Sequence, residues 1–272
     1  MTYRQLCAIL QDAKMEDAEW DALCLMEHFC AVSHSLLRAA PDRNYENAAL
    51  ENAISRRLAH EPLQYILGEW EFYRQTYEVS PDCLIPRADT EVLVETAIRL
   101  LPIGARFADL CTGSGCIAIS IADLRADLRG VAVELYPKTL EIAKRNAKRN
   151  NVLDKILFSQ GDVLLGDALL DERFSAIISN PPYIRTDVID TLSIEVKHEP
   201  RAALDGGEDG LVFYRAITDR AKAVLKPNGF ILYEVGIGQA DDVAAIGEKN
   251  GFSAEIYPDL SGIPRAVLLR KL

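Results

Sequence analysis

The chain has 272 residues, of which 49% are hydrophobic and 26% are charged, and this composition is typical of a globular protein with more than one compact part. Its formal net charge of −11 argues against non-specific nucleic-acid binding, because such binding depends on neutralising phosphates with Lys and Arg. An acidic surface suits a basic protein partner. We therefore expect a protein partner and no direct nucleic-acid partner. We also expect the chain to be a monomer.

The sequence contains no pattern of a metal site, a signal peptide or a membrane span. None of the six cysteines forms a CxxC pair, and no Cys/His cluster has zinc spacing. The first residues, MTYRQLCAIL, lack a basic stretch followed by a long apolar one. No window approaches 18 apolar residues. We expect a cytoplasmic protein with reduced thiols, no metal and no membrane partner.

The first part of the chain is predicted to be helical and the next part to be a hairpin. Apolar residues recur at three- and four-residue spacing up to about residue 60, without the alternation of strands. The following segment is rich in aromatic residues, such as Trp70 and Tyr77, which favours a β-hairpin. The predicted organisation is a helical N-terminal domain over 1–62, a hairpin linker over 63–87 and a catalytic domain over 88–272.

The catalytic domain is predicted to alternate strands and helices. This order is typical of an α/β fold with a doubly wound, mostly parallel sheet. Asp89 or Thr90 is expected to cap the first helix, and Pro227 and Gly229 to close the fourth. The predicted helices are 90–100, 116–124, 137–150, 211–225 and 240–250, and the predicted strands are 107–110, 130–134, 155–160, 174–179, 230–235, 254–258 and 266–270.

The segment DLCTGSGC, residues 109–116, stands between a predicted strand and a predicted helix, where α/β sheets bind nucleotides. Gly113 and Gly115 allow the backbone to approach a ligand closely. Glu134 ends the next strand, where a carboxylate can accept hydrogen bonds from both ribose hydroxyls of an adenosine. The segment lacks the GxGxxG pattern, so NAD fits poorly. The alternative is a tight turn without a ligand.

The segment NPPY, residues 180–183, follows a buried strand and suggests amide chemistry. An amide nitrogen is a poor nucleophile, because its lone pair is delocalised, and it carries two N–H donors. The side-chain oxygen of Asn180 and the backbone carbonyl of Pro181 can accept one donor each, which aims the nitrogen at a methyl donor and favours the growing positive charge. Tyr183 can pack on the flat amide. No strong base is needed. The alternative is a loop that only ends the strand.

These motifs resemble the HemK/PrmC family of release factor glutamine methyltransferases, and the resemblance covers nearly the whole chain. NPPY alone is shared with methyltransferases of DNA adenine and ribosomal-RNA guanine, whereas the segments before and after it are narrower signatures. The matching segments are LIPRADTEVLVE (84–95), DLCTGSGCIAI, NPPYI, EPRAALDGGEDGL (199–211) and LYEVGIGQ (232–239).

The resemblance implies a class I, Rossmann-like methyltransferase fold with a mostly parallel seven-stranded sheet, a hairpin linker and a small all-helical N-terminal domain. It implies S-adenosyl-L-methionine as cofactor, S-adenosyl-L-homocysteine as product, and the glutamine of the GGQ motif in class I peptide chain release factors as substrate. The implied cofactor residues are Cys111, Thr112, Gly113, Ser114, Gly115, Glu134, Asp162, Val163 and Asn180. The implied glutamine pocket is Asn180, Pro181, Pro182 and Tyr183, of which Asn180, Pro181 and Tyr183 are the catalytic candidates.

Two residues depart from the family pattern. Cys111 stands where the family usually has glycine, and a cysteine there needs either a negative φ or some strain. Glu134 stands where the family usually has aspartate, which moves the carboxylate outward by one methylene and should preserve ribose binding.

Other functions stay open at this point. A glutamine of a ribosomal protein is an alternative substrate with the same motifs. An amine methyltransferase of DNA or ribosomal RNA is disfavoured by the acidic charge. A binding module without activity is disfavoured by the intact NPPY. We expect the helical N-terminal domain to dock the substrate, although a purely stabilising role is the alternative.

Overall fold

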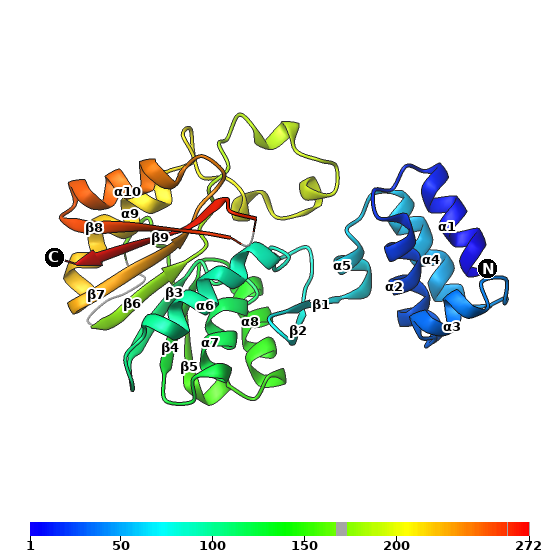
Figure 1. The fold of residues 1–272 in the computed structure, drawn as a ribbon, viewed down its shortest axis with the longest axis horizontal. Coiled ribbons are helices and arrows are strands. Elements are labelled where there is room, and N and C mark those ends of the chain that lie inside the picture. The colour runs from blue at the N-terminus through cyan, green and yellow to red at the C-terminus, as the bar shows by residue number, and fades with distance from the viewer. Residues whose placement is uncertain (167–172, 260, 272) are drawn as a thin grey trace. The chain divides into compact units, whose positions relative to one another are not determined.

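The computed structural model describes residues 1–166, 173–259 and 261–271 (Figure 1). The described residues form two compact units. The first comprises Met1–Gly68 together with Ser193–His198, and the second comprises Glu69–Leu192 and Glu199–Leu272. The predicted catalytic domain 88–272 thus includes 167–172, 260 and 272, which lie outside the described residues.

The first unit is built of helices, as the spacing of its apolar residues predicts. Thr2 begins the first helix with a capping box, because its Oγ1 accepts from the Gln5 N–H at 3.2 Å and its own N–H donates to Gln5 Oε1 at 3.0 Å. Leu6 and Leu10 then point into the core. The helices are α1 (Tyr3–Asp12), α2 (Ala18–Cys30), α3 (His34–Ala39), α4 (Ala48–Leu58) and α5 (Leu63–Leu67).

A buried arginine holds the helices of this unit together. Arg57 of α4 donates from Nε to Asp21 Oδ2 of α2 at 2.6 Å, and from Nη2 to Glu195 Oε1 at 2.7 Å. The side chains of Arg57 and Asp21 are each 4% exposed. Burial raises the pKa of Asp21, and the neighbouring guanidinium opposes that shift. The ion pair therefore compensates two charges that would otherwise be buried alone.

The predicted hairpin is present, but it is shorter than the predicted linker. Strands β1 (Glu69–Phe72) and β2 (Gln75–Glu78) pair antiparallel. The predicted linker begins at residue 63, but in the structure α5 covers that position and ends at Leu67, with Gly68 as its C-cap at a φ of 76°. Aromatic content alone could not show this, since Tyr65 faces a helical core instead of a strand partner.

Besides the β1–β2 hairpin, the described part of the second unit contains a seven-stranded sheet in the order β5-β4-β3-β6-β7-β9-β8. Only β9 runs against the others, which confirms the predicted class I methyltransferase architecture. The strands are β3 (Arg106–Leu110), β4 (Arg129–Glu134), β5 (Ile156–Gln160), β6 (Phe174–Ser179), β7 (Leu225–Glu234), β8 (Phe252–Pro258) and β9 (Pro264–Lys271).

Helices cover both faces of this sheet, and each face has its own apolar core (Figure 1). One core includes Leu93 of α6 and Ile117 of α7, and the other includes Tyr214 of α9 and Val243 of α10. The helices are α6 (Glu91–Leu100), α7 (Cys116–Leu124), α8 (Pro137–Arg149), α9 (Val212–Val224) and α10 (Ala240–Lys249).

The order in which successive strands are added to the sheet reverses between β3 and β6. Strands β4 and β5 follow on one side of β3, whereas β6 and β7 lie on the other side. The loops after β3 and β6 therefore diverge, and a crevice opens at the carboxyl ends of these strands, as the doubly wound fold dictates.

One local prediction was wrong, and another was right in position only. Helix α9 ends at Val224 and β7 already begins at Leu225, so Pro227 and Gly229 lie within a strand at a register shift instead of closing the helix. Thr90, one of the two predicted candidates, is the N-cap residue of α6, but its side chain makes no capping hydrogen bond. Its hydroxyl instead donates to Glu234 Oε2 at 2.6 Å.

Candidate active site

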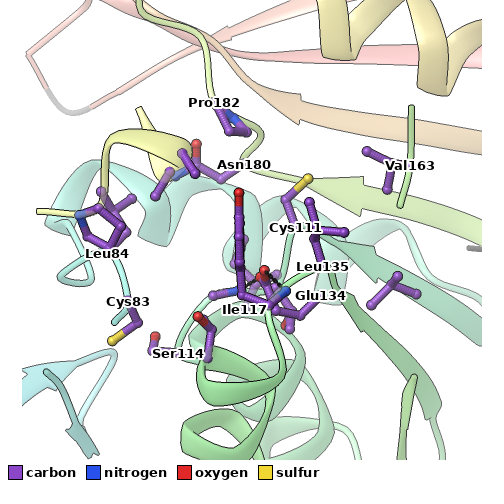
Figure 2. Close-up of a pocket in the computed structure, with 18 of the residues that line it drawn as sticks. Cys83, Leu84, Cys111, Ser114, Ile117, Glu134, Leu135, Val163, Asn180 and Pro182 are labelled. Atoms are coloured by element: carbon purple, nitrogen blue, oxygen red, sulfur yellow. Dashed lines mark hydrogen bonds between the residues drawn. The ribbon is translucent and has the colours of Figure 1, made fainter. Parts of the chain in front are cut away.

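A cavity of about 320 Å³ lies at the carboxyl ends of β3, β4, β5 and β6 (Figure 2). Its size is within the range of small-molecule sites. In the view of Figure 2, Glu134 and Ser114 lie on one side of it, and Asn180 and Pro182 lie on the opposite side. The predicted site residues that line it are Cys111, Thr112, Gly113, Ser114, Glu134, Asp162, Val163, Asn180 and Pro182.

Three predicted site residues do not line the cavity: Gly115, Pro181 and Tyr183. Gly115 has a φ of 83° and immediately precedes α7. A Cβ on it would lie 2.9 Å from Ile119 Cδ1 and 3.2 Å from Ala143 Cβ, so glycine is needed there for close packing of the turn. Pro181 is buried directly after β6.

The glycine loop is held by a buried aspartate. Oδ2 of Asp109 accepts from Thr112 Oγ1 at 2.6 Å and from the Ala118 N–H at 3.1 Å. This ties the loop to the first turn of α7. Oδ1 has no partner among the described residues, and burial raises the pKa of Asp109 to about 7. Asp109 thus supports the glycine loop from below the cavity, a role that the glycine pattern did not reveal.

Glu134 is fixed by backbone N–H groups at the end of β4. Its Oε2 accepts from Gly113 and its Oε1 accepts from Tyr136, both at 3.1 Å. The residue is 8% exposed, and burial raises the pKa of its carboxyl. Each carboxylate oxygen has a second lone pair. Glu134 can therefore accept two further hydrogen bonds from a ligand in the cavity without giving up its backbone partners.

Cys111 adopts a φ of 60°, in the left-handed region. The sequence analysis allowed either a negative φ or a strained backbone at Cys111, and the structure has the strained backbone. This conformation costs on the order of 1 kcal/mol for a residue with a Cβ. Cys111 also packs against the core on the α9 face. Burial raises the pKa of its thiol well above the usual range, so the thiol is neutral and acts as an apolar wall.

Asp162 and Val163 follow β5 and close another side of the cavity. Asp162 Oδ1 accepts from the Leu164 N–H at 2.7 Å, which turns the chain sharply after the strand. Val163 is 7% exposed and belongs to the core on the α9 face. The polar turn at Asp162 can contact the polar edge of a flat heterocycle, and the apolar Val163 side chain can pack on its face.

The side chains of NPPY lie in two directions. Asn180 lines the cavity, and its Nδ2 donates to Thr90 Oγ1 at 3.2 Å. Tyr183 packs against the core on the α9 face, and its hydroxyl donates to Glu234 Oε1 at 3.4 Å. Burial and the nearby Glu234 raise the pKa of Tyr183 above its usual range, so the phenol is neutral. Asn180 is thus the NPPY side chain with polar atoms at the cavity.

The glycine-rich segment after NPPY supports the NPPY backbone. A Cβ on Gly206 would lie 2.7 Å from the Cα of Tyr183, so this close approach requires glycine. Gly206 N–H donates to the Ile184 carbonyl at 2.7 Å, and Ile184 N–H donates to the Leu204 carbonyl at 2.9 Å. Gln239 Nε2 donates to the Tyr183 carbonyl at 3.0 Å. The NPPY backbone is therefore held in place by residues of two other matching segments, EPRAALDGGEDGL and LYEVGIGQ.

The segment before α6 forms part of the cavity wall, which the sequence did not assign. Leu84, Ile85, Pro86 and Arg87 line it. Glu199 is 5% exposed, accepts from the Ile85 N–H at 3.1 Å and pairs with the Arg87 guanidinium. The charged residues of IPRADTE and EPR were the sequence signal for this contact. Only the fold shows that Arg87 and Glu199 lie next to each other.

Among the described residues, no group of three or more His, Cys, Asp and Glu side chains is arranged to hold a metal ion. No described helix combines the length and the apolar character that crossing a membrane requires.

Comparison with protein families identifies two segments of the chain. Residues 2–68 match the PrmC N-terminal domain, and residues 88–226 match the methyltransferase small domain. The first match covers the helical unit up to Gly68, and the second covers the glycine loop, Glu134 and NPPY.

Curated relatives are similar over most of their length. A release factor glutamine methyltransferase of Geobacter sulfurreducens is 44% identical over 82% of this chain and 78% of the relative. Relatives with the same description from Thermodesulfovibrio yellowstonii and Nitratidesulfovibrio vulgaris are 40% and 37% identical, over 85% and 96% of this chain and 84% and 91% of theirs.

A solved methyltransferase structure from Pyrococcus furiosus shares the fold. It has a TM-score of 0.56 and 18% sequence identity, and the match covers 81% of this chain and 98% of that chain.

Proposed function

The chain belongs to the family of release factor glutamine methyltransferases, and from this membership we propose that it methylates the glutamine of the GGQ motif in class I peptide chain release factors. The methyl group goes from S-adenosyl-L-methionine to the side-chain amide nitrogen of that glutamine. The observation that carries the proposal is that one cavity brings together the glycine loop, Glu134 and Asn180.

The cavity fits the proposed cofactor. Glu134 retains a free lone pair on each oxygen for the ribose hydroxyls, and Asp162 and Val163 offer a polar and an apolar contact to the adenine. When bound, S-adenosyl-L-methionine supplies an electrophilic methyl group on a sulfonium. The acidic residues near the loop suit the positive charge of that group.

In the proposed reaction the protein positions the amide and stabilises the charge that grows on its nitrogen. Asn180 Oδ1 and the Pro181 carbonyl each accept one N–H of the glutamine amide, which holds the nitrogen in line with the methyl group. Pro182 contributes an apolar wall. The methylated nitrogen is acidic and releases its proton without a dedicated base.

We propose that the helical domain docks the release factor. Its support is the match of residues 2–68 to the PrmC N-terminal domain, which precedes the methyltransferase domain in this chain. We further propose that the protein acts as a monomer in the cytoplasm, where release factors function. A short GGQ peptide should then be a much poorer substrate than the whole factor. Equal kcat/KM values for the two would contradict docking.

The proposal is tested by offering the protein several acceptors separately, with methyl-labelled S-adenosyl-L-methionine. A class I release factor should become labelled, and peptide mass spectrometry should locate the methyl group on the GGQ glutamine. A factor in which that glutamine is replaced by glutamate is the matched control and should stay unlabelled. Labelling of a ribosomal protein or of DNA, with none on the release factor, would overturn the proposal and identify the alternative.

A further inference from the structure

Asn180 is connected to a buried carboxylate through one hydroxyl group. Asn180 Nδ2 donates to Thr90 Oγ1 at 3.2 Å, and Thr90 Oγ1 donates to Glu234 Oε2 at 2.6 Å. Thr90 is 2% exposed and Glu234 is 1% exposed. Thr90 stands before α6 and Glu234 ends β7, so the three side chains come from distant parts of the chain.

The order of donors along this connection is dictated by chemistry. An ionised carboxylate has acceptors only, and a threonine hydroxyl has a single proton. Thr90 must therefore give its proton to Glu234, which leaves only lone pairs on Oγ1 for Asn180. The group of Asn180 that faces Thr90 must then be the NH2, because the amide oxygen in that place would face a lone pair. The amide oxygen is thereby kept for another partner.

We propose that Thr90 and Glu234 are positioning residues that fix the orientation of the Asn180 amide, so that its oxygen is presented to the substrate. This inference rests on the proposed function, in which Asn180 Oδ1 accepts an N–H of the substrate amide. An inverted Asn180 amide would present NH2 to the NH2 of the substrate and repel it. The proposal gives a chemical role to the threonine in IPRADTE and to the glutamate in LYEVG.

The surroundings of Glu234 allow this control to depend on pH. Burial raises the pKa of Glu234 to about 7, and the hydrogen bond from Thr90 opposes the shift. A protonated Glu234 is itself a donor, so Thr90 can then turn its proton to Asn180, and the amide loses its preferred orientation. The charged and titratable groups that face Glu234 are Arg265 and Asp89, which act on its charge, Tyr183, which donates to it, and Tyr214 and Cys116 nearby.

Substitution of Thr90 tests the proposal kinetically. Thr90→Val keeps the shape but lacks the hydroxyl, and it should lower the single-turnover rate by roughly tenfold to a hundredfold at saturating S-adenosyl-L-methionine. Cofactor affinity should stay within about threefold of the parent. Thr90→Ser keeps the hydroxyl and should restore most of the rate. Thr218→Val is the matched control, because it removes a fully buried hydroxyl that bonds Tyr233 away from the cavity.

Two kinetic outcomes would overturn the proposal. One is an unchanged rate in Thr90→Val. The other is a loss of rate in Thr90→Val that is matched by an equal loss of rate in Thr218→Val or by an equal loss of cofactor affinity. Either pattern would show that Thr90 has only a general structural role. The parent is measured first, so a parent that fails to methylate the release factor refutes the proposed function and not the positioning role.

A measurement without substrate tests the orientation directly. The side-chain amide of Asn180, assigned by NMR with an Asn180→Asp variant, should shift as the pH crosses the pKa of Glu234, about 7. Glu234→Gln removes the titrating group, so this variant should show no such shift. A titration of the Asn180 amide that persists in Glu234→Gln, or its absence in the parent, would overturn the proposal whatever the substrate is.

Discussion

Glu134 Oε2 accepts a hydrogen bond from the backbone N–H of Gly113 at 3.1 Å, so the end of β4 and the glycine loop after β3 are locked together before any ligand binds. The carboxylate therefore has one preferred orientation at the cavity. A preorganised acceptor loses little conformational entropy when the ligand arrives.

Glu134→Ala should weaken binding of S-adenosyl-L-methionine by about 1–3 kcal/mol, because ligand hydroxyls lose a charged acceptor. Glu134→Gln keeps one acceptor oxygen and should be affected less. Isothermal titration calorimetry measures both, with circular dichroism as the control for folding. An unchanged Kd in a folded Glu134→Ala variant would show that another group holds the ribose.

Asn180→Ala should lower the methyl-transfer rate by about 10²–10³, the usual cost of removing one preorganised group that stabilises developing charge. Asn180→Asp keeps an acceptor oxygen and should be intermediate. Single-turnover rates at saturating cofactor are the right measurement, because Asn180 also lines the cofactor cavity. An alanine variant within about threefold of the parent would contradict the assigned role.

The backbone strain at Cys111 predicts an unusual order of stability. Alanine at this position keeps the Cβ, whereas glycine removes it and relieves the left-handed φ of 60°. Cys111→Gly should therefore be more stable than Cys111→Ala by about 1 kcal/mol, although glycine is the more flexible residue in the unfolded chain. Urea unfolding of the two variants decides this, and the reverse order would show that the loop relaxes around a Cβ.

The buried ion pair of the helical unit predicts a rescue by double substitution. Arg57→Leu leaves Asp21 buried without its partner and should lower the free energy of unfolding by about 3–5 kcal/mol. Adding Asp21→Leu removes the unpaired charge and should recover much of that loss. Chemical unfolding followed by circular dichroism measures both variants. A double variant no more stable than the single one would show that the two residues stabilise the unit separately.

Glu234 predicts a pH dependence of stability in the protein without cofactor. Burial raises its pKa from 4.5 to about 7, so between these values the folded protein holds a proton that the unfolded chain has released. Stability should therefore fall as the pH rises through this window, by about 3 kcal/mol from this one group. Asp109, whose pKa is also about 7, adds in the same direction.

Glu234→Gln isolates the contribution of Glu234 to that pH dependence, because Asp109 is unchanged in the variant. The free energy of unfolding, measured in urea at several pH values, should fall less steeply with rising pH in Glu234→Gln than in the parent. Identical slopes in the two proteins would show that Glu234 is already ionised at low pH in the folded state.

The sequence by itself determined the class of fold and most of the elements around the site, although α5 and the start of β7 were missed. Helix Cys116–Leu124 and strand Phe174–Ser179 have the predicted bounds, because each is a nearly continuous apolar run that borders a motif, the glycine turn before the helix and NPPY after the strand. The glycine loop, the acidic residue at the end of the next strand and NPPY were also visible, since each is a short segment whose residue types require special backbone geometry or polar chemistry.

Only the tertiary structure decided how distant residues combine. The sequence made Thr90 a candidate helix cap, whose hydroxyl oxygen would accept from a backbone N–H of α6. The fold instead brings Thr90 to Glu234, 144 residues away, where its hydroxyl donates to a carboxylate oxygen. Tyr183 likewise turns to Glu234, and Glu199 meets Ile85, although no local pattern links them. Periodicity carries information about neighbours within a few residues, whereas the orientation of Asn180 depends on contacts that form only when β6, β7 and the start of α6 pack together.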